Sequence, residues 1–170
     1  MSILKYLLFL TVLAFLTPNT LAQKCNYEKN EIDGLLEIPI KRTASEMLCR
    51  IDNQPFYIKA QCIGDNKYLK LIYYKYNGFV IKDDREIGLI LPGNDELTLF
   101  PRVMPVDTAE IDDIMDMTTL IIYKLSTDQY ETLKNIPVIK FKYFINGGFI
   151  VKDIKASKQP VIMQLLRCVE

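Results

Sequence analysis

The chain has 170 residues, of which 21 are basic, 21 are acidic and 49% are hydrophobic. A chain of this length can bury a core of its own, and a net charge of zero gives no general attraction for nucleic acid or anionic membranes. Histidine is absent, which excludes the Ser-His-Asp and Cys-His catalytic mechanisms. We therefore expect one domain that does not bind nucleic acid.

The N-terminus has the pattern of an export signal. Lys5 supplies a positive charge, and the apolar stretch Tyr6 to Leu16 is too short to span a bilayer. Thr20-Leu21-Ala22 then offers small residues to a signal peptidase. We predict a signal peptide over residues 1–22, cleaved after Ala22.

Residues 23–170 would then form a single exported domain, secreted or periplasmic. Lipidation of Cys25 is the alternative, and it needs a small residue directly before the cysteine. Gln23-Lys24 stands there instead. We expect no stable membrane anchor after cleavage.

Four cysteines follow the signal and are disulfide candidates, because an exported protein folds in an oxidising compartment. They are Cys25, Cys49, Cys62 and Cys168. Three pairings are open. We favour Cys49 with Cys62, because a hairpin turning near residues 53–55 would set them opposite each other, and this leaves Cys25 with Cys168 to join the chain ends. A zinc site is not expected, since the chain has no CxxC pair and no histidine.

The front half is rich in β-strand patterns. Residues 23–36 have alternating charge and few apolar side chains, so we expect a loosely attached segment. Residues 35–40 predict a short edge strand, because Pro39 lacks the donor that a central strand needs. Residues 47–51 and 56–63 predict two strands on either side of a turn at 53–55.

Two stretches predict β-hairpins of the core sheet. In residues 67–82, Asn77-Gly78 suits a two-residue turn, and residues 67–76 are apolar on both faces, as in a central strand. Residues 136–153 repeat the device: Gly-Phe-Ile-Val-Lys-Asp at 148–153 echoes Gly-Phe-Val-Ile-Lys-Asp at 78–83. In a two-residue register, Lys140 opposes Asp153. The similarity of the two hairpin sequences is explained either by their independent origin or by an ancestral duplication.

The remaining elements are short strands and helices. We predict strands at 87–91, 96–100 and 118–125, and helices at 107–117, 126–134 and 156–169. Ser126 suits the N-cap of the second of these helices. The expected fold class is α+β: a mainly antiparallel β meander or sandwich-like sheet with two or three short helices, including a C-terminal one.

Acidic residues offer the remaining routes to catalysis or metal binding. Asp83 with Asp84, or Asp112 with Asp116, could serve a glycosidase, although their setting is polar and typical of solvated loops. The acids of residues 107–116 could bind calcium, but the segment lacks the glycine and ligand alternation of a calcium loop. Helix capping and a solvated face explain the same acids, and we expect no metal or cofactor.

Aromatic side chains crowd both hairpins. We expect most to be core, but an antiparallel sheet can leave one face exposed, and tyrosines there suit a partner. The candidate binding surface comprises Tyr73, Tyr74, Tyr76 and Phe79.

The last 50 residues resemble a group of exported proteins. The segment Tyr123 to Lys134, followed by a strand, a hairpin and a terminal helix, is similar to small exported bacterial proteins of unknown function. In these, a Leu-Ser/Thr-x-Asp/Glu-Gln helix start precedes an Ile-rich strand. The resemblance implies an α+β fold and assigns no activity.

The function we expect is a non-enzymatic interaction module that binds an envelope or extracellular protein or glycan through a sheet face or edge. The alternative is a carboxylate-dependent hydrolase of envelope or extracellular glycans. A purely structural subunit, recognisable as a stable homo-oligomer, is a third hypothesis.

Overall fold

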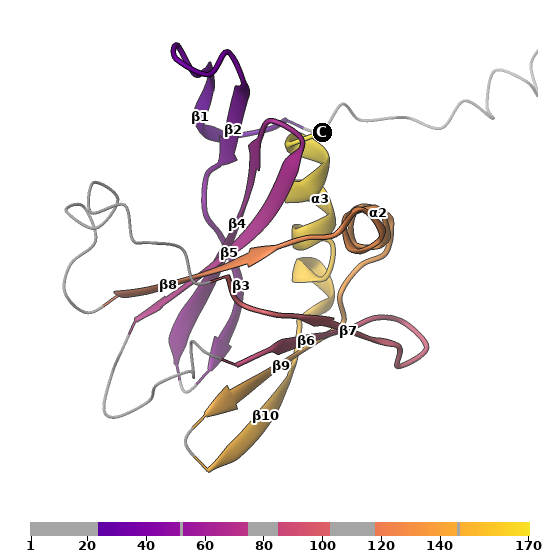
Figure 1. Cartoon of the computed structure of the whole chain (residues 1–170). Coiled ribbons are helices and arrows are strands. Elements are labelled where there is room, and N and C mark those ends of the chain that lie inside the picture. Colours follow the sequence, from indigo (N-terminus) through magenta and orange to yellow (C-terminus); the bar gives the residue numbers. More distant parts are fainter. Residues whose placement is uncertain (1–23, 52, 75–84, 103–117, 146) are drawn as a thin grey trace, which may run out of the picture.

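The computed structural model describes residues 24–51, 53–74, 85–102, 118–145 and 147–170. Within them the chain forms two antiparallel sheets and two α-helices (Figure 1), so the predicted α+β class is confirmed. In chain order the elements are β1 (Tyr27–Ile32), β2 (Pro39–Thr43), β3 (Glu46–Ile51), β4 (Gln54–Ile63), β5 (Asn66–Tyr74), β6 (Ile87–Ile90), β7 (Glu96–Leu99), β8 (Thr118–Lys124), α2 (Thr127–Asn135), β9 (Lys140–Ile145), β10 (Gly148–Asp153), η2 (Ala156–Lys158) and α3 (Val161–Cys168).

The first sheet has the order β1-β2-β4-β5-β8, and β3 also pairs with β4. The long strand β4 pairs with β3 through its first half and with β2 through its second half. A tight turn joins β4 to β5, with Ile63 opposite Asn66. Strand β5 lies between β4 and β8, which confirms the central strand predicted from its apolar faces.

The second sheet has the order β10-β9-β6-β7 and consists of two hairpins. Ile145 lies opposite Gly148 and Lys140 opposite Asp153, so the two-residue register predicted for the second hairpin is confirmed. Lys140 Nζ lies 3.3 Å from a carboxylate oxygen of Asp153. Local turn chemistry fixes this register, because Gly147 adopts a φ of 108° that side chains rarely tolerate.

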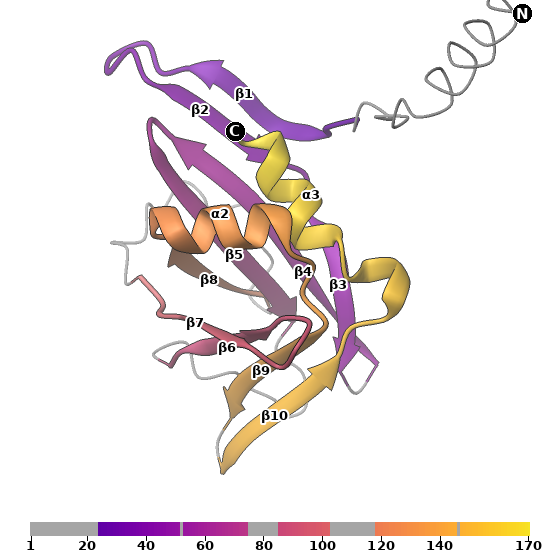
Figure 2. The same cartoon turned by 90° about the vertical axis from the view of Figure 1, so that its right-hand side faces the viewer.

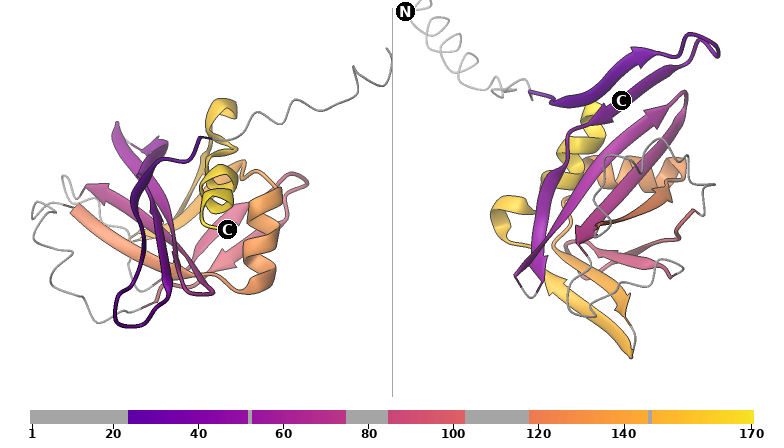
Figure 3. Two further views of the ribbon diagram at one scale, coloured as in Figure 1. Left: turned by 90° about the horizontal axis from the view of Figure 1, so that it is seen from above. Right: turned by 90° about the vertical axis from the view of Figure 1, so that its left-hand side faces the viewer.

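The core lies between the first sheet and a layer made of α2, α3 and the second sheet (Figures 2 and 3). The Phe56 ring joins the two sheets: it stacks on Tyr73 at 5.6 Å and contacts the Tyr143 ring at 5.8 Å. Most apolar residues of α3 are buried, namely Val161, Ile162, Leu165 and Leu166. The helix buries more than one face, because α3 packs on β4 and on α2. No helix in the described ranges is long and apolar enough to cross a membrane.

The helix α2 begins at the predicted cap. The Ser126 hydroxyl accepts the Gln129 N–H at 3.2 Å, and the Gln129 side-chain oxygen accepts the Ser126 N–H at 2.9 Å. This reciprocal capping box satisfies two backbone donors. The Gln129 amide also donates to the Thr98 carbonyl at 3.0 Å, which ties α2 to β7. A single residue therefore starts the helix and positions it on the second sheet.

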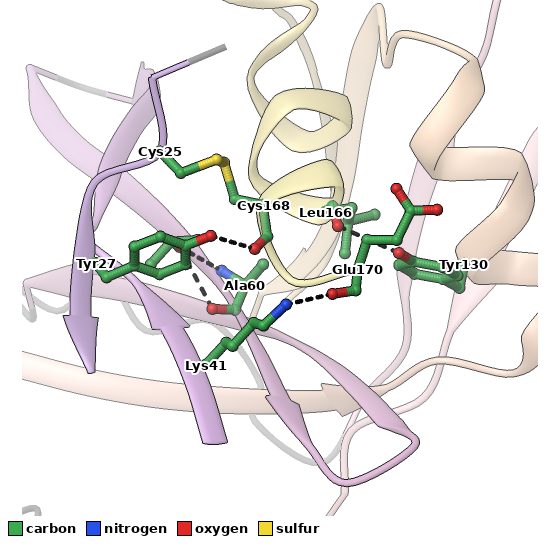
Figure 4. The surroundings of a disulfide bond; sticks show 9 residues. Cys25, Tyr27, Lys41, Ala60, Tyr130, Leu166, Cys168 and Glu170 are labelled. Atoms are coloured by element: carbon green, nitrogen blue, oxygen red, sulfur yellow. Dashed lines mark hydrogen bonds between the residues drawn. A yellow bond between two sulfur atoms is a disulfide. The ribbon is translucent and has the colours of Figure 1, made fainter. Parts of the chain in front are cut away.

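The disulfide Cys25–Cys168 forms, as predicted, and joins the segment before β1 to the end of α3 (Figure 4). The predicted Cys49–Cys62 disulfide is wrong: both thiols are free and buried. The turn near residues 53–55 does form, but Cys49 lies opposite Phe56. Cys62 is six residues further along β4, roughly 20 Å away at a rise of about 3.3 Å per residue.

Two predictions for the N-terminal part are also corrected. Residues 23–36 are not loosely attached, because they contain β1, which pairs with β2. Strand β2 is not at an edge, since it lies between β1 and β4, and Pro39 is its first residue, where no ladder donor is required.

The helix predicted at 156–169 is split by Pro160 into η2 and α3. The signal peptide, the Asn77-Gly78 turn and the predicted helix at 107–117 lie outside the described residues.

Candidate functional site

The binding surface predicted on the first hairpin is not supported at Tyr73. Its side chain is completely buried and stacks on Phe56 between the two sheets. Tyr74 lies at the end of β5, and its side chain is outside the described set, as are Tyr76 and Phe79. Phe149, which holds in the second hairpin the place of Phe79 in the first, is 59% exposed.

The outer face of the second sheet displays an aromatic pair flanked by cations. The rings of Phe144 and Phe149 meet edge to face at 6.2 Å, as expected for neighbours on adjacent strands. Lys142 Nζ lies 5.1 Å from the Phe149 ring centre, and the Arg85 guanidinium lies 4.9 Å from that of Phe144. Val151 is 42% exposed beside them. We call Phe144, Phe149, Val151 and Lys142 the aromatic face.

A glycine positions the charges next to this face. Lys142 Nζ lies 3.1 Å from both carboxylate oxygens of Glu96 on β7. Gly88 lies between them on β6, and a Cβ there would collide with the Glu96 carboxylate. The missing side chain lets Glu96 reach across β6 to the lysine. Because Lys140 is also paired with Asp153, the cations of β9 are neutralised and the aromatic face is apolar at its centre.

The edge of the second sheet at β10 presents backbone hydrogen-bonding groups. The Ile154 N–H donates to the Ile139 carbonyl at 2.8 Å. The backbone N–H and C=O groups of the even-numbered residues of β10 therefore point toward β9. Hydrogen-bonded and non-bonded pairs alternate in an antiparallel ladder. The backbone groups of Phe149, Val151 and Asp153 therefore point away from β9. Among the described strands, β10 pairs with β9 alone.

Two other edge strands in the described ranges, β8 and β7, are better covered. Pro101 forms a bridge to Tyr123 on β8, and the Arg102 N–H donates to the Ile122 carbonyl at 2.7 Å. On β7, the Thr98 carbonyl accepts a hydrogen bond from the Gln129 side-chain amide. Natural sheets cover or charge their edges to avoid unwanted pairing. At β10, Phe149 and Val151 instead leave the edge apolar and exposed.

A groove with polar and apolar lining lies beside α3. It has a volume of about 340 Å³ and lies among residues 24–26, residues 43–46, η2 and α3. Ala44, Val161 and Leu165 are among its lining residues, and so are Lys24 and Lys158. Lys158 Nζ is 3.9 Å from a carboxylate oxygen of Glu46.

The carboxylates that the hydrolase hypothesis invoked cannot be placed. Asp83, Asp84, Asp112 and Asp116 lie outside the described residues, as does the acidic segment considered for calcium. Within the described ranges, no group of three or more Cys, Asp and Glu side chains is arranged to hold a metal ion.

The pKa of the Asp33 carboxyl is lowered, first by the Leu36 N–H and then by the Leu35 N–H. The pKa of Glu170 is lowered too, chiefly by its hydrogen bond with Lys134.

Of the predicted binding surface, the structure describes the side chain of Tyr73 alone, which is buried, whereas Phe149 of the second hairpin is exposed. The sequence pattern identified the aromatic crowding of both hairpins, and on β9 the side chains of Phe141 and Tyr143 are buried. It did not identify β10 as an edge, because edge position depends on which strands pair over long sequence distances. The signal that could have found it is the pair Phe149 and Val151, alternating on one face directly after a glycine turn.

Comparisons with known proteins found no relative: no family model, no curated protein and no solved structure matches the chain.

Proposed function

We propose that the chain is an exported, non-enzymatic binding module that takes an extended segment of an envelope or extracellular protein along β10. One observation carries this proposal: the outward backbone groups of Phe149, Val151 and Asp153 lie beside the exposed Phe149 and Val151 side chains. An added strand would find main-chain donors and acceptors and an apolar surface in the same place. Strand addition of this kind is a recurrent mode of peptide recognition.

The chemistry of the aromatic face indicates which segment fits. In an added antiparallel or parallel strand, every second side chain falls on the outer face of the sheet. There it meets Phe149 and Val151, whose neighbours Lys142 and Asp153 are already ion-paired. A charged side chain would have to compete with these pairs, whereas an apolar one buries the phenyl ring. The preferred segment alternates apolar residues with polar ones.

The test is affinity capture of the tagged protein from its own cell envelope after mild cross-linking, followed by binding measurements with the purified partner. Val151→Pro removes an outward N–H and leaves the hydrogen bonds to β9, whereas Val151→Thr keeps that N–H. We expect the proline variant to lose binding by tenfold or more and the threonine variant to retain it. Both variants are first compared with the wild type by thermal melting.

Equal binding by the two variants would show that no strand is added at β10. A glycan array provides the competing outcome. Binding of a glycan that depends on the Phe149 ring and is insensitive to Val151→Pro would replace the protein partner by a carbohydrate.

A further inference from the structure

The β1–β2 hairpin projects from the body of the protein and carries apolar side chains at its tip (Figures 1 and 2). Ile32 is 71% exposed, Leu35 is 94% exposed and Leu36 is 68% exposed. Single exposed leucines are common on protein surfaces. Three large apolar residues within five positions of a protruding turn form a cluster, which we call the leucine tip.

The turn that displays the leucine tip is held by its own hydrogen bonds. The Asp33 carboxylate accepts the N–H groups of Leu35 at 3.0 Å and Leu36 at 2.8 Å. The Asp33 N–H donates to the Ile38 carbonyl at 2.8 Å, and the Asp33 carbonyl accepts the Glu37 N–H at 2.9 Å. A preformed turn loses little conformational freedom when it binds, so more of the burial of the leucines is available for affinity.

One residue of the turn is held in an unfavourable conformation. Glu37 has a φ of 53°, in the left-handed region that residues with a Cβ rarely adopt. This φ directs the chain back into β2 while Leu35 and Leu36 remain outside. The tip is also acidic: Glu31 is ion-paired with Lys29 at 2.9 Å, but residues 32–38 contain Asp33 and Glu37 and no base.

The groove on the other side of the molecule has complementary properties. Its volume of about 340 Å³ is more than twice the roughly 150 Å³ of a dry apolar cavity that admits benzene, so small apolar side chains fit. Ala44, Val161 and Leu165 supply apolar lining and Lys24 adds a positive charge, while Lys158 is ion-paired with Glu46, which also lines the groove. An acidic turn with leucines at its end matches this combination.

The tip cannot reach the groove of its own chain. Asn26 lines the groove, whereas Ile32 ends β1 six residues later, which is roughly 20 Å at a rise of about 3.3 Å per residue. The views from two sides agree that the tip and η2, whose Ser157 and Lys158 line the groove, point in opposite directions (Figures 2 and 3). A contact between tip and groove must therefore join two molecules.

We infer that the leucine tip of one copy inserts into the groove of the next, so that the protein assembles head to tail. Such a contact uses two different surfaces, and it propagates into an open chain unless its rotation closes a ring. The contact leaves β10 free in every copy. It therefore stands independently of the strand-binding function proposed above, and an assembled chain presents many copies of the aromatic face.

Sedimentation velocity of the full exported chain, from micromolar to submillimolar concentration, tests this inference. We expect the average mass to rise with concentration beyond that of a dimer. Leu35→Ser with Leu36→Ser removes the apolar tip, and Ser157→Trp fills the groove from an exposed rim position. Each variant alone should be monomeric, because burial of each leucine changes an association constant by roughly tenfold or more. Mixing the two variants should restore one contact and give a dimer.

Controls separate this contact from other associations. Val151→Ser on β10 should leave the assembly unchanged, and melting curves should show that all variants are folded. A wild-type chain that stays monomeric, assembly that survives in both the tip and the groove variants, or a mixture that does not dimerise would each overturn the inference. So would tip-dependent binding to phosphatidylethanolamine–phosphatidylglycerol vesicles by a protein that does not self-associate, since the tip would then be a lipid anchor.

Discussion

The Tyr27 hydroxyl donates a hydrogen bond of 2.7 Å to the carbonyl of Cys168, the residue that is disulfide-bonded to Cys25 (Figure 4). Two residues of the N-terminal segment thus hold the same residue at the end of α3. The carbonyls in the last turn of a helix lack intrahelical donors, and the tyrosine supplies one. The disulfide therefore joins the segment before β1 to α3 and helps to fix the C-terminus of a core helix.

Removing this disulfide should destabilise the protein strongly. Cys25 and Cys168 are separated by 143 positions, and in the chain-entropy account a cross-link over so long a loop contributes about 3–5 kcal/mol to the free energy of unfolding. We expect Cys25→Ala with Cys168→Ala to lose that amount in urea denaturation. Tyr27→Phe is the control for the hydrogen bond alone and should lose about 1 kcal/mol. A larger loss in the tyrosine variant would place the main constraint in the hydrogen bond.

The free thiol of Cys49 should make stability fall at alkaline pH. Burial raises its pKa from 9.0 to about 11, partly opposed by the charge of Lys152. The unfolded chain releases this proton near pH 9 and the folded chain only near pH 11, so stability is lost between these values, by about 2–3 kcal/mol. The slope should be smaller in Cys49→Ala. Identical pH slopes between pH 9 and 11 for the two proteins would mean that the thiol is not buried.

The ion pair of Lys134 with the C-terminal residue should have the opposite pH dependence. Lys134 Nζ lies 3.0 Å from Glu170 and 3.1 Å from Glu131. Because the hydrogen bond with Lys134 lowers the pKa of Glu170, the stabilisation is present above its ordinary pKa of 4.5 and is lost as the pH falls through the lowered value. Glu170→Gln should melt below the wild type at pH 7, and the difference should vanish at strongly acid pH. A difference that persists in acid would indicate packing.

The parts of the fold that depend on local chemistry could be predicted from the sequence. The pair of Lys140 with Asp153 follows from a two-residue turn, and the start of α2 follows from the capping properties of Ser126. The expectation that most aromatic residues of the hairpins are core holds for Phe141 and Tyr143. In each case the determining residues lie within about a dozen positions of one another.

The features that could not be predicted depend on distant pairings. Residues 27–32 have few apolar side chains, yet they form a strand because β2 offers an edge and the disulfide holds the segment in place. The sequence predicts a Cys49–Cys62 disulfide because the two cysteines flank a turn. Strand β4 is so long, however, that Cys62 lies in register with Lys41 on β2. Whether an aromatic residue is core or surface likewise depends on the second sheet, which covers Tyr73 and leaves Phe149 outside.

The hydrogen-bond pattern of β10 can be tested without knowing the partner. If the Ile154 N–H faces β9, then the Lys152 N–H also faces β9 and the Val151 N–H faces outward. Lys152→Pro should remove the N–H that donates a hydrogen bond to the Phe141 carbonyl across the β9–β10 ladder. Val151→Pro should remove only an N–H that faces solvent. Both prolines restrict the backbone of the same strand, so the conformational cost of proline largely cancels when the stabilities of the two variants are compared. We expect Lys152→Pro to be less stable by about 1–3 kcal/mol in urea denaturation.

The two prolines also decide the basis of the proposed function. Equal losses would mean that β10 is too frayed to present an ordered edge. A larger loss for Val151→Pro would place the outward groups on the even-numbered residues, away from the exposed Phe149 and Val151 side chains. In that arrangement an added strand would bond to residues whose side chains lie on the inner face, including Ile150, which packs against the core. Only the expected order of stability aligns an open backbone edge with the aromatic face.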